Sequence, residues 1–434
     1  MADNKDKKVL NVPAKREQND ACISSAEREE QVTKAQPKGN VPALRFPEFT
    51  EEWKKCTIKD YGEVITGNTP PTKNIEYYSN GSYLWASPAD LGLSKHITST
   101  KTKLSLLGLK KTRTIPQGSI LVTCIGSTIG KMGMATETMS TNQQINSVIV
   151  NDSTNNDFAY YAILNAFPRY LSEVGVQAVP ILSKSNFEKL PNHTTTKEEQ
   201  RKLGYFLNLL DERIATQNKI IEKYESLIQA MCDTLIGKKT QQVMLSFNDF
   251  GESYSGLSGK SAEDFGEGSP YITYMNVYQN QIIDITDIGL VKINKTEQQS
   301  LVQYGDILFT LSSETPEEVG MGAVYLGETY PLYLNSFCFG IHITDESKIF
   351  PPFLAYYVSS ESFRKAVFPL AQGSTRFNLQ KGDFLKKVFP FPAIEQQRKI
   401  YSILKTYSDK LNIEKQMIKL LCCQKQYLLR QLFI

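Results

Sequence analysis

The sequence has few of the residues from which metal sites are usually built. Its 434 residues include three histidines and seven scattered cysteines, with no C-x-x-C pair. Zinc sites of the usual ligand spacing are therefore excluded, and the odd number of cysteines favours a reducing cytoplasm. The sequence also has no apolar run of about 18 residues, as a membrane span needs, and no apolar signal-peptide core. We expect a cytoplasmic protein with no membrane partner.

Complete catalytic motifs are absent as well. NTPPT (68–72) approaches the Asn-Pro-Pro-aromatic motif of adenine methyltransferases, but Thr69 interrupts it and Thr72 replaces the aromatic residue. GSTIGKM (126–132) is one residue short of a phosphate-binding loop and ends in Met. We expect that the chain is not an enzyme. An independent methyltransferase would have to bind S-adenosylmethionine by itself.

Acidic residues are missing from Leu91 to Thr136. This stretch holds seven basic residues, which are Lys95, Lys101, Lys103, Lys110, Lys111, Arg113 and Lys131. Such a run suits a surface that faces phosphate groups, although a merely solvated face would look the same. The net charge is +4 over residues 44–197 and −7 over residues 240–393, so the two halves of the chain differ in charge.

What the sequence does contain is a long internal repeat. The helix start EEQRKL (198–203) returns as EQQRKI (395–400), 197 positions later. Other matching pairs are PQGSILVT (116–123) with QYGDILFT (303–310), NQQINSVIV (142–150) with NSFCFGIHI (335–343), and FAYYAIL (158–164) with LAYYVSS (354–360). The matching segments keep the same order, while the sequence distance between the members of a pair changes slightly, as expected for insertions in loops. The sequence therefore predicts two copies of one unit.

Each copy combines a mixed domain with a long helix. Short apolar runs such as SILVTCI (119–125) and DILFTL (306–311) predict strands between helical stretches. After each domain, apolar residues alternate three and four apart over about five heptads, which is typical of a coiled coil. The seam positions are Leu203, Leu207, Leu210, Ile214, Gln217, Ile221, Tyr224, Ile228, Met231 and Leu235 in the first copy, and Ile400, Leu404, Tyr407, Leu411, Glu414, Ile418, Leu421, Lys425, Leu428 and Leu432 in the second.

The predicted fold class is α/β, of the α+β type. It has two globular domains separated by an antiparallel pair of long coiled-coil helices and related by a pseudo-twofold axis. The predicted parts are a disordered leader (1–40), a first domain (41–197), a first spacer helix (198–239), a second domain (240–393) and a second spacer helix (394–434). The first helix would be about 58 Å long at about 1.5 Å per residue, which suits a ruler for duplex DNA.

Two polar residues interrupt the helix seams. Gln217 and Glu414 occupy the same position in the two copies, near the middle of each seam. Single polar residues in a seam can fix its register, and we predict this role for both. The alternative is that both point outward from a locally wet seam.

Several segments resemble the specificity subunit of type I restriction–modification systems. They are VPALRFPEF (41–49), the strand pattern G-S/D-I-L-x-T and the helix entry FPAIEQQRKI (391–400). The duplicated order of domain and helix is similar too, and the resemblance covers about Val41 to Phe433. It implies a subunit without an active site that reads a bipartite DNA sequence, one half with each target-recognition domain.

The same resemblance implies the partners and cofactors. The partners would be double-stranded DNA, two methyltransferase subunits that use S-adenosylmethionine, and two restriction subunits that use ATP and Mg²⁺. This chain itself would bind no cofactor. A competing interpretation is a coiled-coil scaffold that binds only proteins. Such a scaffold would show no salt-dependent affinity for DNA, whereas a protein that contacts phosphates loses affinity steeply as salt rises.

In the first domain, side chains that reach base edges or phosphates are expected on loops. GSTIGK (126–131) is a tight loop after a strand where the backbone can approach a phosphate, or alternatively an ordinary glycine-containing turn. The candidate DNA-binding residues of this domain are Lys73, Asn74, Lys101, Lys103, Lys110, Lys111, Arg113, Ser127, Thr128, Lys131 and Gln177. In the second copy LSSETPEEVGMG (311–322) replaces CIGSTIGKMG (124–133), so the two domains need not use the same loop.

In the second domain, AQGSTRFNL (371–379) is the best candidate for a base-reading loop, because Arg pairs with guanine and Gln or Asn with adenine. The candidates are Gln372, Ser374, Thr375, Arg376, Asn378 and Lys381. The alternative is a solvated loop with Arg376 in a surface salt bridge. Tyrosine-rich segments (159–161, 271–278 and 355–357) could stack on bases, but we favour a role in the core.

Overall fold

The computed structural model describes residues 39–434 except 174–180, 238–241, 295 and 329. The predicted leader therefore lies almost wholly outside the described residues, and so does Gln177. The chain divides into two compact units. Unit 1 is Met1–Asn218 with Gln416–Ile434, and unit 2 is Lys219–Lys415.

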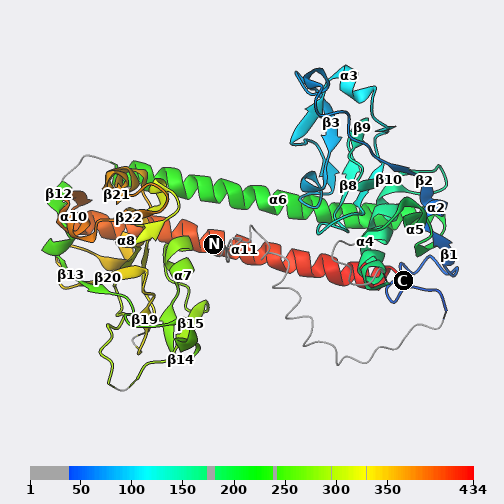
Figure 1. Ribbon diagram of the computed structural model, residues 1–434. Helices are drawn as coiled ribbons and strands as arrows, with labels where there is room; N and C mark the ends of the chain where they lie inside the picture. Colours follow the sequence, from blue (N-terminus) through cyan, green and yellow to red (C-terminus); the bar gives the residue numbers. More distant parts are fainter. Residues whose placement is uncertain (1–38, 174–180, 238–241, 295, 329) are drawn as a thin grey trace, which may run out of the picture. The chain divides into compact units, whose positions relative to one another are not determined.

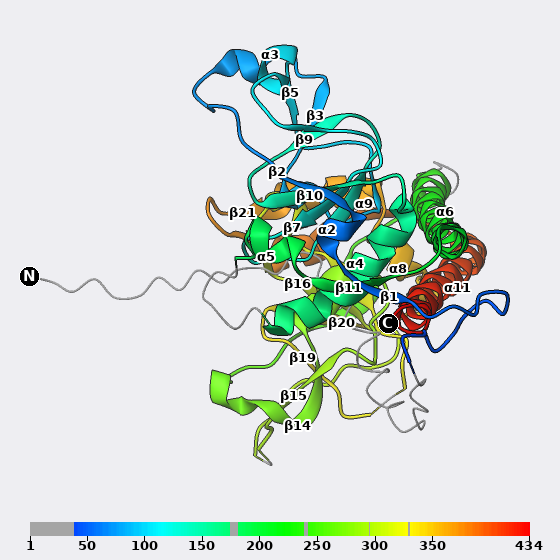
Figure 2. The same ribbon diagram turned by 90° about the vertical axis from the view of Figure 1, so that its right-hand side faces the viewer.

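Unit 1 is built on a sheet with the strand order β2-β10-β7-β8-β4. Its strands are β2 (Gly62–Thr66), β10 (Ile145–Val150), β7 (Ile120–Thr123), β8 (Met132–Ala135) and β4 (His96–Ile97). A second sheet and a short helix form a small lobe on the side away from helix α4 (Figures 1 and 2). The lobe contains β5 (Thr102–Leu104), β3 (Tyr83–Ala86), β9 (Met139–Thr141), β6 (Thr114–Ile115) and α3 (Leu106–Leu109). The other elements of this domain are β1 (Lys54–Thr57), α2 (Ile58–Tyr61), α4 (Asn156–Glu173), α5 (Lys184–Glu188) and β11 (Pro191–Thr194).

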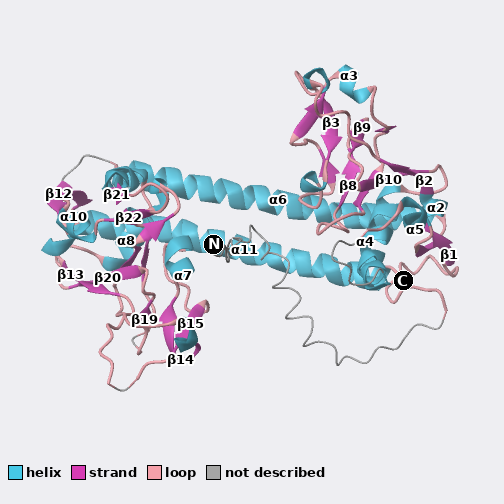
Figure 3. Ribbon diagram, in the orientation of Figure 1, coloured by secondary structure: helices cyan, strands magenta, loops and turns pink. Residues whose placement is uncertain are grey.

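Unit 2 contains a sheet with the order β13-β20-β16-β18 and two smaller sheets, β15-β14-β19 and β17-β22-β21 (Figure 3). The strands are β12 (Gln242–Leu245), β13 (Gly251–Ser255), β14 (Phe265–Ile272), β15 (Ile288–Val291), β16 (Ile307–Thr310), β17 (Ser312–Ser313), β18 (Gly322–Val324), β19 (Tyr333–Leu334), β20 (Cys338–Ile343), β21 (Ala371–Gln372), β22 (Phe377–Leu379) and β23 (Phe389–Pro392). The helices are α7 (Tyr274–Gln279), α8 (Pro351–Tyr357), α9 (Glu361–Val367) and α10 (Lys381–Lys386).

The strand connections confirm the predicted internal repeat. The order β2-β10-β7-β8 in unit 1 corresponds to β13-β20-β16-β18 in unit 2, and these neighbours are antiparallel in both units. The strand that opens each domain pairs with the strand just before the long helix, β1 with β11 and β12 with β23. Tyr160, Tyr161, Tyr356 and Tyr357 are buried, which confirms the core role favoured for two of the tyrosine-rich segments.

Two long helices follow the domains, α6 (Lys197–Ile236) and α11 (Ile394–Leu432). All twenty predicted seam residues are buried or half-buried. In unit 1 the start of α6 packs on the end of α11, where Asp211 and Lys425 form an ion pair of 2.5 Å. In unit 2 the end of α6 packs on the start of α11, and nearer the middle of both helices Glu225 and Lys415 pair at 2.7 Å. The helices are therefore antiparallel, as predicted. None of the helices in the described residues is long and apolar enough to cross a membrane.

The repeated helix start has a structural cause. Gln200 is buried in α6; its side-chain amide donates to the carbonyl of Thr195 over 2.8 Å, and its oxygen accepts from the N–H of Asn155 over 2.8 Å. Gln397 makes the same contacts in α11, donating to Pro392 over 2.9 Å and accepting from Phe350 over 2.9 Å. Each glutamine thus joins three elements: the preceding strand, the long helix and the entry to the domain's own helix. A buried side chain that satisfies backbone groups on two segments is hard to replace, which accounts for its presence in both copies.

Candidate nucleic-acid interface

Three segments of unit 2 meet at one backbone junction. Leu311 donates its N–H to the carbonyl of Phe337 over 2.8 Å, and Leu379 donates to the carbonyl of Leu311 over 2.8 Å. Next to these bonds β17 pairs with β22, which sets Ser312 opposite Asn378. The junction therefore joins the segment after β16, the turn before β20 and the segment predicted to read bases.

Unit 1 contains the same junction. Cys124 donates its N–H to the carbonyl of Gln144 over 2.8 Å, and Leu182 donates to Cys124 over 2.8 Å. Ile125 and Ile181 form an isolated bridge where the corresponding residues of unit 2 pair between strands. The repeat therefore preserves the frame that holds these loops, while the side chains on the loops differ.

An asparagine shapes the turn before the central strand in both units. The side-chain oxygen of Asn142 accepts from the N–H of Gln144 over 3.0 Å, and that of Asn335 accepts from the N–H of Phe337 over 2.9 Å. This bond to the backbone two residues ahead fixes the turn. In unit 1 the side-chain oxygen of Gln144 also accepts from the side-chain amide of Asn142 over 3.1 Å, whereas in unit 2 the side chain of Phe337 is 55% exposed.

In unit 1 this turn touches two of the loops predicted to face DNA. The hydroxyl of Thr69 donates to the side-chain oxygen of Gln143 over 2.5 Å, which links the turn to loop 67–74. The side-chain amide of Gln144 lies beside Gly126, in loop 126–131. The structure thus brings together loops that are about sixty residues apart in the sequence.

The small lobe of unit 1 carries most of the basic candidates. Lys73, Asn74, Lys101, Lys103, Lys110, Lys111 and Arg113 are all exposed on it. Asn68 ties two of its segments together, because its side chain donates to the carbonyl of Lys111 and accepts from the N–H of Arg113, both over 2.8 Å. The guanidinium of Arg113 also donates to the carbonyl of Thr66 over 2.8 Å. The contact of these residues with DNA stays a prediction.

Loop 126–131 joins β7 to β8 and is therefore a turn between strands. Gly126 and Gly130 have φ angles of 91° and 89°, which side chains other than hydrogen rarely adopt, so the turn needs glycine at both positions. Ser127 and Lys131 are exposed and Thr128 is half-buried. The tight turn leaves these groups at the surface; a phosphate contact there stays a prediction.

Lys95 differs from the other basic residues of the acid-free stretch. Its side chain is 4% exposed and donates to carboxylate Oδ1 of Asp157 over 2.6 Å and to Oδ1 of Asn208 over 2.8 Å. Burial lowers the pKa of Lys95, although the bond with Asp157 raises it. The interpretation of the whole stretch as a phosphate-facing surface is therefore wrong for Lys95, which is used inside unit 1.

The segment predicted to read bases in the second domain is a β-hairpin. Strands β21 and β22 pair antiparallel, and residues 373–376 form the turn between them. Gly373 has a φ angle of 139°, and a Cβ there would lie 2.1 Å from the carbonyl oxygen of Arg376. The exposed candidates on the hairpin are Gln372, Ser374, Thr375, Arg376 and Asn378.

Arg376 is paired with an aromatic ring rather than with an acid. Its guanidinium lies 5.7 Å from the ring centre of Phe337. Within the described part of the chain it makes no ion pair, so the structure does not support the alternative of a surface salt bridge. A guanidinium held over a ring keeps its hydrogen-bond donors available at the ring edge.

Two basic residues near the hairpin serve packing within unit 2. Lys381, predicted to bind DNA, is half-buried with its ammonium 5.2 Å from the ring centre of Phe339, and burial lowers its pKa. Arg364 donates over 2.6–2.7 Å to the carbonyls of Glu317, Val319 and Gly320. Arg364 thereby holds the loop that replaces the glycine-rich turn of unit 1.

Sequence reasoning missed Phe337, Gln143 and Gln144. Phe337 is 55% exposed although it is large and apolar. The internal repeat could have identified them, since NQQ (142–144) and NSF (335–337) share the turn-forming asparagine and differ at the next two positions. Variable residues on a preserved turn are the pattern expected where two domains read different targets.

The two polar seam residues lie in different units. Gln217 is buried in unit 1, and Glu414 is half-buried in unit 2, where it pairs with Lys410 at 3.3 Å. Their predicted role in setting the helix register stays a prediction.

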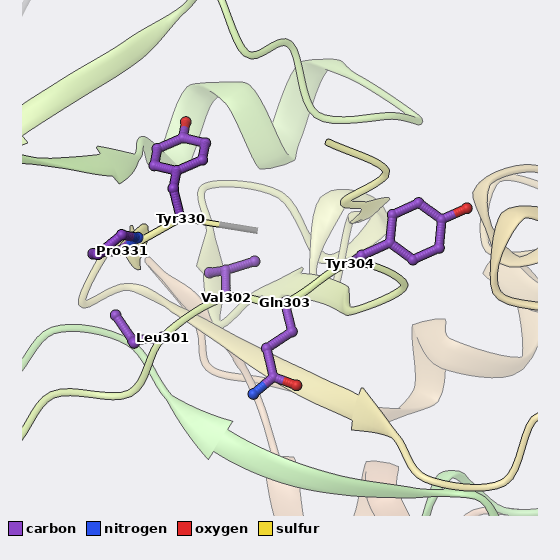
Figure 4. Close-up of a pocket in the computed structure, with 6 residues that line it drawn as sticks. All are labelled: Leu301, Val302, Gln303, Tyr304, Tyr330 and Pro331. Carbon is purple, nitrogen blue, oxygen red and sulfur yellow. The ribbon is translucent and has the colours of Figure 1, made fainter. Parts of the chain in front are cut away.

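Unit 2 also contains a pocket of about 430 Å³, which we consider as an alternative functional site (Figure 4). It is lined by Leu301, Val302, Gln303, Tyr304, Tyr330 and Pro331. These six side chains include no carboxylate, imidazole, thiol or amine, and the hydroxyls of Tyr304 and Tyr330 are the groups among them that acid–base or nucleophilic catalysis can use. Among the described residues, no cluster of three or more His, Cys, Asp or Glu could hold a metal ion.

The family of the chain follows from its match to the type I restriction modification DNA specificity domain, which covers residues 50–226 and again 244–421. The chain belongs to this family. Its two matches coincide with the two copies of the repeat. The specificity subunit of the type I restriction enzyme MjaVIII from Methanocaldococcus jannaschii is 24% identical over 402 residues, 86% of this chain and 89% of the relative.

Two further relatives match over one part of their length. The MjaIX specificity subunit of the same organism is 30% identical over 182 residues, 40% of this chain, and the HindI specificity subunit of Haemophilus influenzae is 33% identical over 151 residues, 34% of this chain. The chain spans 42% and 32% of these relatives.

Solved structures share the fold. A crystal structure of the S subunit of a type I system from M. genitalium has a TM-score of 0.54 at 18% identity, covering 91% of this chain and 99% of the other. A chain from a study of assembly of the type I restriction–modification complex has a TM-score of 0.56 at 14% identity, covering 92% and 98%. The predicted fold class and family are thus confirmed.

Proposed function

We propose that this chain is the DNA specificity subunit of a type I restriction–modification complex and reads a bipartite target, one half with each domain. The observation that carries the proposal is the junction shared by both units. Its backbone hydrogen bonds place the loops in the same way in both units, while the side chains on these loops differ. This is what two domains that recognise different base sequences need.

In this function the chain is not catalytic and binds no cofactor itself. Two methyltransferase subunits would supply S-adenosylmethionine chemistry, and two restriction subunits would use ATP and Mg²⁺. The complex would act on double-stranded DNA in the cytoplasm. The side chains of the interface suit a chain that reads DNA, because they offer donors for bases and phosphates.

The experiment is a map of N6-methyladenine across the genome of the host, with the gene for this chain intact and deleted. We expect loss of methylation at a split motif with a fixed gap. Unchanged methylation while the partner methyltransferase is expressed and active would contradict the proposal.

Binding of the purified complex to duplex DNA at several salt concentrations separates this function from a protein-binding scaffold. A subunit that contacts phosphates gives a straight decline of the logarithm of affinity with the logarithm of salt. A scaffold that binds only proteins gives no affinity for DNA at any salt concentration.

A further inference from the structure

Phe337 and Arg376 form an exposed pair at the junction of unit 2. Phe337 is 55% exposed, and the Arg376 guanidinium lies 5.7 Å from its ring centre. Exposing a phenylalanine side chain costs about 1.5–3 kcal/mol relative to burial, so such a residue needs a reason. Its position on a turn fixed by Asn335 means that the fold does not need the ring for packing.

The pair is held by rigid backbone rather than by loose loops. Phe337 accepts a hydrogen bond from Leu311, and Leu311 accepts one from Leu379 at the end of the hairpin that carries Arg376. The turn and the hairpin therefore keep one spacing. Two side chains that project from one frame with a fixed spacing can recognise two neighbouring chemical groups on a ligand.

The carboxylate of Glu318, in loop 311–322, is occupied by protein groups. It accepts from the hydroxyl of Ser313 over 3.1 Å, and a hydrogen bond from Tyr278 lowers the pKa of Glu318. The guanidinium of Arg364 donates hydrogen bonds to three backbone carbonyls of the same loop. Although unit 2 is acidic overall, Arg376 makes no ion pair with an acid of the described residues.

The chemistry of the pair matches two features of the major groove. An arginine fork donates to O6 and N7 of guanine, and an apolar ring packs on the 5-methyl group of thymine. Adjacent base pairs are about 3.4 Å apart along the helix axis, so groups 5.7 Å apart can reach neighbouring pairs but not distant ones.

We propose that Arg376 and Phe337 read a guanine and an adjacent thymine in the half-site of the second domain. The inference rests on the proposed function and adds base identities to it.

The test uses the complex of this chain with its methyltransferase subunits and duplexes that carry the mapped target. Each thymine of each half-site is replaced in turn by deoxyuridine, which lacks only the 5-methyl group. For one thymine next to a guanine we expect about fourfold weaker binding, the value of one buried methyl group. With Phe337→Ala the same replacement has no effect, because the methyl group then has no partner.

The guanine is tested in the same way with 7-deazaguanine, which removes the N7 acceptor. We expect binding to weaken by about tenfold with the natural chain and by less than twofold with Arg376→Ala. Leu290→Ala is the matched control, since Leu290 is an exposed apolar residue of β15 in the same unit; it keeps the full response to both altered bases.

The outcomes separate this inference from the proposed function. If the natural complex methylates a split motif but neither half-site contains a guanine next to a thymine, the pair does something else. Equal responses to deoxyuridine in Phe337→Ala and in the natural chain overturn it as well. If the natural complex shows no salt-dependent DNA binding and directs no methylation, the proposed function itself fails.

Discussion

The two domains attach to the long helices in chemically different ways, although they share one frame. In unit 1 the hydroxyl of Tyr161 donates to Asp211 of α6 over 2.7 Å, and Lys95 and Lys425 pair with acids around it. In unit 2 the hydroxyl of Tyr356 contacts Ser408 of α11 over 3.0 Å. Asp211 and Ser408 hold the same position in the repeated helices, whereas their tyrosine partners differ by one position, because Tyr356 is the counterpart of Tyr160. Unit 1 thus uses charges where unit 2 uses two hydroxyls.

The first turns of the helices differ in the same sense. Glu199 of α6 is buried and accepts two bonds of 2.7 Å from Arg45, which raises the pKa of that arginine. The corresponding Gln396 of α11 is exposed. Gln200 and Gln397, one position further, make the same bonds in both units. The repeat therefore keeps the neutral hydrogen bonds that close the fold, and varies the charged contacts around them.

The ionic cluster of unit 1 offers the largest expected effect. Lys95→Met keeps the length of the side chain but leaves Asp157 without its cation and Tyr161 without a donor. Removing one partner of a buried ion pair costs about 3–5 kcal/mol, and we expect the lower end because Asp157 is 29% exposed. Hydrogen exchange of unit 1 peptides in the full chain measures the loss of local stability.

The change for comparison in unit 2 is Tyr356→Phe, which removes the hydroxyl contact with Ser408 and costs about 1 kcal/mol. Hydrogen exchange of unit 2 peptides in the full chain provides the value for comparison. Equal losses in the two units would show that the charges of unit 1 add nothing beyond the hydroxyl bond.

The shared glutamines come next. Gln200→Leu and Gln397→Leu each leave unpaired an N–H and a carbonyl that are at least partly buried, which we expect to cost about 1–3 kcal/mol in either unit. Similar losses follow from the similar geometry, and urea unfolding of the full chain followed by hydrogen exchange measures them unit by unit.

Gln396→Leu is the control for the glutamine changes, because this residue is the exposed neighbour of Gln397. Surface substitutions of this kind change stability by about 0.5 kcal/mol or less. A large loss of stability in only one unit would mean that the two glutamines do not stabilise their units in the same way, although their hydrogen bonds are alike.

A smaller effect is expected from the charge at the helix start. Glu199→Gln keeps the shape but removes the charge that pairs with Arg45, and we expect a loss of about 1–2 kcal/mol in unit 1. The reverse change, Gln396→Glu, places a charge at an exposed position and should leave the stability of unit 2 unchanged within about 0.5 kcal/mol. Thermal unfolding of both variants measures whether a carboxylate adds stability at the buried position 199 but not at the exposed position 396.

Much of this comparison was predictable from the sequence, and the reasons differ from one feature to the next. The seam residues and the repeat follow from periodicity, which survives any loop change. The use of Lys95 inside unit 1 was not predictable, because its partners Asp157 and Asn208 are remote in sequence and charge runs do not show which members turn inward. Phe337 was missed for a related reason: a single apolar residue beside a strand is most often core, and only the structure shows its exposure.

The smallest effect concerns one turn and responds to pH. Asn151 and Asp345 take the same place in the two units; each accepts the N–H and hydroxyl of the serine two residues ahead, Ser153 and Ser347. Hydrogen bonds from Ser347 and the nearby Lys348 lower the pKa of Asp345 to about 2 from 3.8, so its ionised form stabilises the fold above pH 3.8 and this contribution is lost as the pH falls toward 2. Replacing Asp345 by Asn should reduce stability slightly at neutral pH, with a difference from the natural chain that disappears near pH 2. Urea midpoints of the two proteins between pH 2 and 6 measure it, and a difference that stays constant over this range would mean that unit 2 uses only the shape of this turn, as unit 1 does with Asn151.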